Sequence, residues 1–247
     1  MKKILLVLVM AMSSLWSADA MFQSVESSKA TVLQDGKSRE YCPNCGMHIP
    51  KYYKTSHAVK FKDGTYRQFC SIHCLVDESE MGFLRDKKNK ITQTLVADVD
   101  SLEMIDAKKA FYVVGSKVAG TMTVNSQYAF GTKAGAEDFV KGYGGKIMNF
   151  DDTYSTALKD FTNDIKMLKS KKDGSVYMAG KTIMSKFCDE AKVLVIHAHN
   201  VGETKQAIKE SGACKADLSD SQLQALTLYY WDVKLGNFEK QYGALLK

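Results

Sequence analysis

The alternation of hydrophobic and polar positions in the first half of the chain predicts a short unit of strands and one helix. Two segments, HAVKF (57–61) and TYRQF (65–69), alternate or carry β-branched and aromatic residues, and Asp63-Gly64 lies in the turn between them, a pattern typical of a β-hairpin. Apolar residues then recur at helical spacing in residues 71–85, and residues 91–100 (ITQTLVADVD) return to strand character. These segments predict the order β-β-α-β.

The same order of predicted elements recurs in the next stretch of the chain. Strands are predicted at residues 110–116 and 121–130, a helix closed by glycines at 133–145, and a last strand at 146–152. TYRQFCS aligns with SQYAFGT, and TLVADVD aligns with KIMNFDD, which indicates an internal duplication. Because a unit of about 40 residues buries little core alone, the two units are expected to share a core or to pack closely.

The remainder of the chain has a different, helical character. Residues 153–172 are charged and predicted to form a helical linker, and residues 173–247 are predicted to form a small helical domain in which Ser219 is a candidate N-cap. The predicted fold class is therefore α+β: two tandem β-β-α-β modules, at about residues 41–102 and 103–152, followed by a small α-helical C-terminal region.

The N-terminus has the pattern of a secretory signal peptide. Two lysines precede an apolar run at residues 4–12, and the small-residue pattern Ala18-Asp19-Ala20 predicts cleavage near Ala20 and export. No run approaches the roughly 18 to 20 apolar residues of a membrane helix, so no transmembrane segment is expected. The first cysteine is Cys42, so no lipid anchor is expected in the mature chain. Residues 21–40 are polar without a sustained period and are predicted to form a flexible arm.

Composition and charge narrow the classes of function. Hydrophobic residues make up 45% of the chain and charged residues 25%, which is typical of a globular protein. The net charge is +6, but the basic residues are scattered, and their nearest cluster, Lys166 to Lys172, is interpreted as a solvated helix end rather than a nucleic-acid-binding face. Export favours disulfides among the six cysteines, and Cys188 and Cys214, far from the other four, are the candidates for a structural disulfide.

The stretch YCPNCGMHIP, residues 41–50, concentrates soft metal donors. Cys45 and Met47 flank Gly46, whose conformational freedom lets both sulfurs turn toward one ion, while Cys42 adds a second thiolate and His48 an imidazole. Cu(I) prefers thiolate and thioether donors, whereas zinc gains almost nothing from a methionine. Cys42, Cys45, Met47 and His48 are therefore the candidate ligands of a Cu(I) site, with a zinc site or a simple disulfide as the alternatives.

A second group of donors leaves two alternatives open. Cys70 and Cys74 are spaced one helical turn apart with His73 beside them, and two such cysteine pairs can assemble a structural zinc site. An exported thiol-disulfide oxidoreductase is the other alternative; it needs a CxxC at the start of a helix that follows a strand, and Pro43 suits a helix start. Cys70, His73 and Cys74 are the secondary candidates for metal ligands.

Four segments in this order and spacing resemble the NosL family of accessory proteins for nitrous oxide reductase: CPNCGM, RQFCS, MIDAKKAFYVVGSKVAGTM and YAFGTKAGAEDFVKGYGGKIMNFDD. The resemblance covers roughly residues 40–152. It implies two β-β-α-β modules and a non-enzymatic metallochaperone that binds Cu(I) in the bacterial periplasm and delivers it to the reductase or its assembly proteins. It places the family's CxxCGM motif on Cys42, Cys45, Gly46 and Met47, and Cys70 on the family's Phe-Cys-Ser stretch; Cys74 has no counterpart.

Two features depart from the family pattern. Family members are commonly lipoproteins, and this chain lacks the anchoring cysteine. The region after residue 152 extends beyond the family pattern, and its segments GKTIMSKFCDEAK and ADLSDSQLQALTLYYWDVK resemble the first and last helices of a small c-type cytochrome. Covalent haem attachment requires C-x-x-C-H, which the segment from Cys188 to Lys192 does not contain, so the resemblance implies a helical region without haem.

Overall fold

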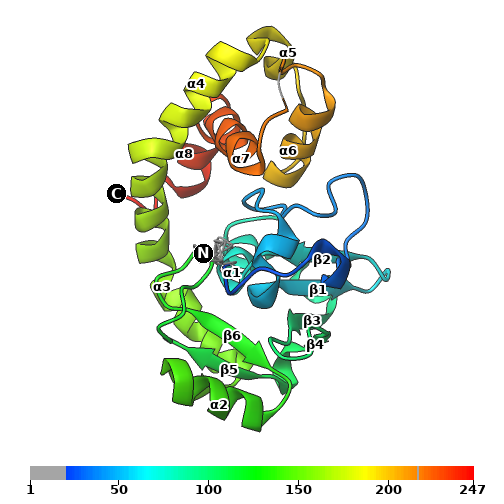
Figure 1. Cartoon of the computed structure of the whole chain (residues 1–247), viewed down its shortest axis with the longest axis vertical. Coiled ribbons are helices and arrows are strands. Elements are labelled where there is room, and N and C mark those ends of the chain that lie inside the picture. The colour runs from blue at the N-terminus through cyan, green and yellow to red at the C-terminus, as the bar shows by residue number, and fades with distance from the viewer. Residues whose placement is uncertain (1–20, 216) are drawn as a thin grey trace, which may run out of the picture.

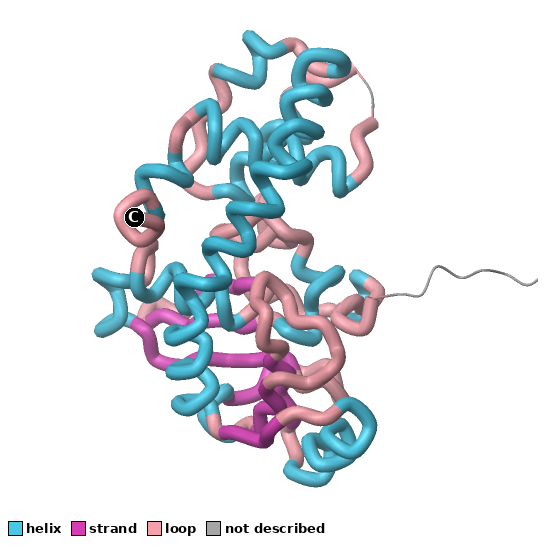
Figure 2. The backbone as a smooth tube through the Cα atoms, turned by 90° about the vertical axis from the view of Figure 1, so that its left-hand side faces the viewer, coloured by secondary structure: helices cyan, strands magenta, loops and turns pink. Residues whose placement is uncertain are grey.

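The computed structural model describes residues 21–215 and 217–247. The predicted signal peptide lies outside the described residues. Two small antiparallel sheets lie at one end of the molecule and a helical region lies at the other, so the fold class is α+β as predicted (Figure 1, Figure 2). Within the described ranges, no helix is long and apolar enough to cross a membrane.

The first sheet has the strand order β2-β1-β3-β4, and all its neighbours pair antiparallel. Its elements are β1 (His57–Phe61), β2 (Tyr66–Phe69), α1 (Ile72–Glu80), β3 (Ile91–Ala97) and β4 (Met104–Asp106). Three 3-10 helices adjoin them: η2 (Ile49–Thr55) before β1, η3 (Arg85–Lys90) between α1 and β3, and η4 (Ala107–Lys109) after β4.

The second sheet has the order β6-β5-β7. Its elements are β5 (Phe111–Val114), β6 (Gln127–Phe130), α2 (Lys133–Tyr143) and β7 (Lys146–Met148). In both sheets the first strand of the module lies between the second strand and the strand after the helix, which confirms the duplicated β-β-α-β prediction. Ser71 and Thr132, which align in the repeat, are the N-caps of α1 and α2, and each accepts a hydrogen bond from a backbone N–H three residues later.

The two modules share a buried core, as the small size of each one predicted. Val59 and Phe69 of the first sheet lie in the same apolar cluster as Tyr112 and Ala129 of the second. A parallel bridge between Asp98 and Ala129 also links the two modules. The modules are therefore one packing unit.

The helical part begins with α3 (Phe150–Lys171), which continues through a π-helix, η5 (Lys172–Val176), into α4 (Tyr177–Phe187). The remaining elements are α5 (Glu190–Leu194), α6 (Val201–Glu210), α7 (Asp220–Leu228), the π-helix η6 (Tyr229–Lys234) and α8 (Asn237–Tyr242). Ser219 caps α7 in a capping box, as predicted. Helices α4 and α7 lie beside each other around a second apolar core that includes Met184, Leu226 and Tyr230 (Figure 1).

Two segments have more tertiary contacts than their sequence patterns indicate. Within residues 21–40, expected to be a flexible arm, the N–H of Leu33 donates to Gln68 Oε1 at 2.8 Å, and Gln34 Oε1 accepts from the N–H of Gln68 at 3.0 Å. Residues 153–172, expected to be a linker, belong mostly to α3, which packs on α1 and contributes Phe161 to the shared core. The arm is bound to β2 by hydrogen bonds of amide groups, and such contacts produce no hydrophobic period in the sequence. This is why the pattern of residues 21–40 did not predict them.

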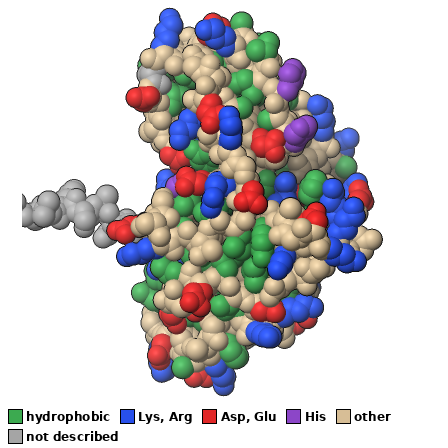
Figure 3. Space-filling model, turned by 90° about the vertical axis from the view of Figure 1, so that its right-hand side faces the viewer, with side chains coloured by type: hydrophobic (Ala, Val, Ile, Leu, Met, Phe, Trp, Pro, Cys, Tyr) green, Lys and Arg blue, Asp and Glu red, His purple; other side chains and the backbone are tan. Residues whose placement is uncertain are grey.

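Lys and Arg side chains are interspersed with Asp and Glu on the face shown in Figure 3, in agreement with the scattered positions of the basic residues along the chain. The run from Lys166 to Lys172, the densest basic stretch, spans the end of α3 and the start of η5. Its Lys169 pairs with Asp173 and its Lys172 with Asp232. The run is therefore not a helix end, because α3 continues through η5 into α4, and Lys172 is largely buried in its pair with Asp232.

Candidate metal centre

Four cysteines from two separate segments gather in the core of the first module. The Sγ atoms of Cys42, Cys45, Cys70 and Cys74 all lie within 4.8 Å of one another. Cys45 Sγ is 3.4 Å from Cys70 Sγ, and Cys70 Sγ is 3.6 Å from Cys74 Sγ. All four side chains are buried, and none is in a disulfide. The structure thus joins the primary and the secondary cysteine candidates into one cluster.

The local backbone explains how Cys42 and Cys45 come to face the same point. The N–H of Gly46 donates to the carbonyl of Cys42 at 2.8 Å, and the N–H of Cys42 donates to the carbonyl of Met47 at 2.8 Å. Gly46 has a φ of 74°, a left-handed conformation that favours glycine. We call the tight loop formed by residues 42–46 the cysteine loop.

The second pair is positioned by the start of a helix. Cys70 directly follows β2, Ser71 is the N-cap of α1, and Cys74 lies in the first turn of that helix. Cys70 thus lies outside the helix, and the extended backbone of Ser71 places its sulfur beside that of Cys74 in the first turn. The strand-to-helix junction of the β-β-α-β module is therefore the platform of the cluster.

The pKa values of three cysteines in the cluster are shifted in different directions. Burial alone would raise the pKa of the Cys42 thiol, but hydrogen bonds from the thiols of Cys45, Cys70 and Cys74 outweigh it and lower that pKa well below its usual range. Burial raises the pKa of Cys70, and the neighbouring cysteines, Cys42 first, raise the pKa of Cys74. The cluster therefore favours a thiolate at Cys42 beside thiols at Cys70 and Cys74. A thiolate is the form of cysteine that binds metals.

The other predicted donors lie around this cluster rather than within it. Met47 is partly buried and packs against the apolar core that contains the four cysteines. His48 is not in the cysteine group; its Nε2 lies 3.3 Å from Glu40 Oε2. His73 is also outside the group, 2% exposed, with its ring against Phe161 and Nδ1 3.5 Å from Asp164 Oδ2.

A small cavity of about 30 Å³ adjoins the cluster, and one soft donor that lines it was not among the predicted ligands. Cys45, His73 and Met122 line this cavity. Met122 has a φ of 65°, which is uncommon for a residue with a side chain and is often found at functional sites. Met122 is the last residue of the segment MIDAKKAFYVVGSKVAGTM, and its place in that motif could have pointed to it. A single methionine without other donors beside it in the sequence does not indicate a metal ligand.

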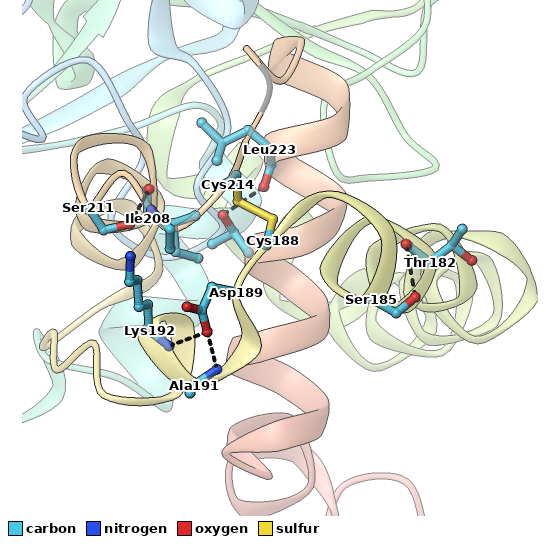
Figure 4. The surroundings of a disulfide bond; sticks show 12 residues. Thr182, Ser185, Cys188, Asp189, Ala191, Lys192, Ile208, Ser211, Cys214 and Leu223 are labelled. Carbon is cyan, nitrogen blue, oxygen red and sulfur yellow. Dashed lines mark hydrogen bonds between the residues drawn. A yellow bond between two sulfur atoms is a disulfide. The ribbon is translucent and has the colours of Figure 1, made fainter.

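The remaining two cysteines form a disulfide in the helical region. Cys188 and Cys214 are bonded to each other where α4 ends and the chain returns from α6 (Figure 4). Backbone hydrogen bonds flank the bond, from the N–H of Asp189 to the carbonyl of Ala213 and from the N–H of Lys215 to that of Phe187, each 2.7 Å. The two groups of cysteines are thus in different chemical states, one reduced and one oxidised.

The fold and the site together define a duplicated α+β protein whose first module encloses a cluster of buried thiols. A family model described as NosL matches residues 34–158, about half of the chain, and the chain belongs to the NosL family. The match ends in α3, so most of the helical region lies outside it.

No curated protein matches the chain. Among solved structures, the copper chaperone NosL from Shewanella denitrificans is 27% identical; the match covers 49% of this chain and 92% of that one, with a TM-score of 0.37.

Proposed function

We propose that this protein is a periplasmic Cu(I) chaperone that supplies copper for the maturation of nitrous oxide reductase. The observation that carries the proposal is the cluster of four buried cysteine sulfurs, with Met47 adjoining it, in a member of the NosL family. Cu(I) is a soft ion that prefers such thiolate and thioether donors. The signal-peptide pattern supports export, and the reductase or its assembly proteins are the proposed recipients.

In this proposal, copper is cargo and the residues of the chain hold it only until transfer. Cys42 offers a thiolate before the metal arrives, the Cys45 sulfur lies with it in the cluster, and Met47 directly follows the cysteine loop and packs against the same core. Binding to further thiols releases their protons. An incoming donor from the recipient adds to the copper before an old ligand leaves, so the protein makes and breaks no bond in a substrate and is not an enzyme.

A structural zinc site is the second candidate, and one observation favours it. Four thiolates around a tetrahedral zinc, each about 2.3 Å from the metal, lie roughly 3.8 Å from one another. The sulfur separations of 3.4 and 3.6 Å are close to this value. A thiol-disulfide oxidoreductase is less well supported, because an attacking thiolate has to be accessible and all four sulfurs are buried.

An anaerobic competition titration of the reduced mature protein with a Cu(I)-specific chromophoric chelator tests the proposal. We expect tight binding of about one copper ion per chain. A double variant, Cys45→Ser with Met47→Leu, should lose more than about 100-fold in affinity, beyond the 10- to 100-fold cost of losing a second-shell partner.

Met148→Leu is the matched control, since Met148 also packs, partly buried, against the same core. It should bind copper like the unaltered protein. Copper binding indifferent to the double variant, together with zinc in the purified protein and unfolding on chelation, would replace the proposal with the zinc candidate.

A further inference from the structure

The helical region outside the family match contacts the cysteine loop directly. The N–H of Val201, at the start of α6, donates to the carbonyl of Pro43 at 3.0 Å. From α7, Gln224 Nε2 donates to the carbonyl of Cys45 at 2.7 Å. Figure 1 shows the ends of α6 and α7 facing the N-terminal segment that carries this loop. Two helices thus bind the backbone between the two cysteines that begin the cluster.

Lys205 of α6 is the central contact, because its ammonium group is wholly buried at this junction. Its Nζ donates to the carbonyl of Gly46 at 3.1 Å, to Asp220 Oδ1 at 2.7 Å and to Gln224 Oε1 at 2.9 Å. It also lies 4.6 Å from the ring centre of Tyr41. A buried ammonium is unfavourable unless its donors are paired, so all three hydrogen bonds are expected to stabilise the closed arrangement.

The helical region and the N-terminal segment approach each other so closely at two glycines that a side chain on either one would force its neighbours to shift. A Cβ at Gly202 would lie 3.1 Å from the carbonyl oxygens of both Tyr41 and Cys42. A Cβ at Gly46 would lie 3.0 Å from Val201 Cγ1. The junction is therefore closely fitted, and a side chain introduced at Gly202 would act as a wedge.

A second junction holds the same loop from the opposite end of the helical region. Asp77 of α1 is buried and accepts hydrogen bonds from Asn44 Nδ2 at 2.9 Å and from Gln241 Nε2 at 3.0 Å. It also accepts one from the hydroxyl of Tyr242. Asn44 lies between the cysteines of the loop, whereas Gln241 and Tyr242 belong to α8. The loop is thus connected to α6, α7 and α8.

We propose that the C-terminal helical region is the cover of the metal site, and that Lys205 is the positioning residue that holds it closed on the cysteine loop. Cys42, Cys70 and Cys74 have no exposed surface in this arrangement. Ligand exchange requires a donor of the recipient to reach the metal, so loading and release require the cover to move away. The role in metal release rests on the proposed copper function, whereas the closure itself is a property of the metal-free protein.

The closure is tested by the alkylation rate of the four free thiols with N-ethylmaleimide, in the reduced, metal-free full chain with its Cys188–Cys214 disulfide intact. We expect slow reaction in the unaltered protein and at least a tenfold faster reaction in Gly202→Leu and in Lys205→Met. Gly142→Leu on α2 is the control, because Gly142 has open space around it, and its rate should stay within twofold of the unaltered one. Equal rates in all four proteins would overturn the proposal.

Urea separates movement of the cover from unfolding of the chain. Local opening exposes little surface, so the alkylation rate should rise only shallowly with urea below the transition seen by circular dichroism. A rate that follows global unfolding alone, in Lys205→Met as in the others, would contradict the proposal.

The copper-loaded protein gives the last readout. Release of Cu(I) to the chelator should accelerate by the same factor as alkylation in the two cover variants. Unchanged release from a loaded Gly202→Leu protein would overturn the role in metal transfer. If no variant binds copper while the alkylation pattern holds, the proposed copper function fails and the closure stands.

Discussion

At the scale of single residues, His57 links the two modules and makes stability depend on pH. It lies in β1, 1% exposed, with Nδ1 3.0 Å from the carbonyl of Thr55 and Nε2 3.2 Å from the hydroxyl of Tyr112 in the other sheet. Burial lowers the pKa of His57 to about 4, against 6.5 when it is exposed, although the backbone of Thr55 acts in the opposite direction. The folded protein therefore holds this imidazole neutral.

The sign of the effect follows from proton binding. Between pH 6.5 and 4 the unfolded chain binds the proton and the folded chain does not, so the contribution of His57 is complete above pH 6.5 and is lost as the pH falls to 4. The loss amounts to about 3 kcal/mol. In urea unfolding at pH 7 and pH 4, His57→Gln should lack this decline, so its free energy of unfolding should differ less from that of the unaltered protein at pH 4 than at pH 7. The control, His199→Gln at an exposed histidine, should have the same free energy of unfolding as the unaltered protein at both pH values. A difference between His57→Gln and the unaltered protein that does not change with pH would refute the assignment.

Some residues of the candidate site could be predicted from the sequence and others could not. Cys42 and Cys45 stand out because the two thiols share one short motif, and the motif survives in the structure as a turn. Cys70 and Cys74 were weaker candidates because chain spacing does not show that a strand end and a helix start will meet the turn. Lys205 could not be found, since a lysine in an amphipathic helix is normally solvated, and only the tertiary junction buries this one.

At the scale of elements, the closest helix contact in the C-terminal region depends on Gly180 in α4. A Cβ at this position would clash with the carbonyl of Ala225 and lie 2.5 Å from Tyr229 Cβ, so α4 and α7 pack with their backbones close together. Gly180→Ala should therefore destabilise the helical region by about 2 to 3 kcal/mol, although alanine is the better helix former.

Gly142→Ala is the matched control for Gly180→Ala, since it makes the same exchange in α2 where nothing lies within 4 Å. It should leave stability unchanged or raise it by up to about 1 kcal/mol. Both free energies are measured by urea unfolding followed by circular dichroism. Equal effects of the two exchanges would show that α4 and α7 are not packed this closely.

Element types were predictable because strand and helix periods differ, and each β-β-α-β module carries both periods in the same order. The end of the last strand was predicted wrongly. Residues 146–152 were predicted to be a strand, but β7 ends at Met148, and α3 begins at Phe150 with Asn149 as its N-cap. The two π-helices were also missed, since η5 and η6 continue adjoining helices without a break in their polar and apolar pattern.

At the scale of the whole molecule, the two largest apolar clusters lie in the modules and in the helical region. The helical region has its own apolar cluster, including Ile183, Val193 and Leu223, but α8 adds Phe238 and Tyr242 to the core that contains the four clustered cysteines. Because α8 packs on η6, whose Tyr229 and Tyr230 belong to the cluster of the helical region, loosening of that region should affect the cysteine loop without unfolding the modules.

The disulfide between Cys188 and Cys214 gives a way to loosen the helical region alone. It joins residues 26 apart, so removing it should cost about 3 to 4 kcal/mol by the loss of a constraint on the unfolded chain. The double variant Cys188→Ser, Cys214→Ser should unfold its helical region at lower urea than the modules, as two separate transitions. The fluorescence of Trp231, in η6, would report the first transition, and the circular dichroism that remains after it would report the second. Between the two transitions the four cluster thiols should become reactive, because the cover has opened while their module remains folded. A single transition in which thiol reactivity and both signals change together would show instead that the modules and the helical region form one cooperative unit.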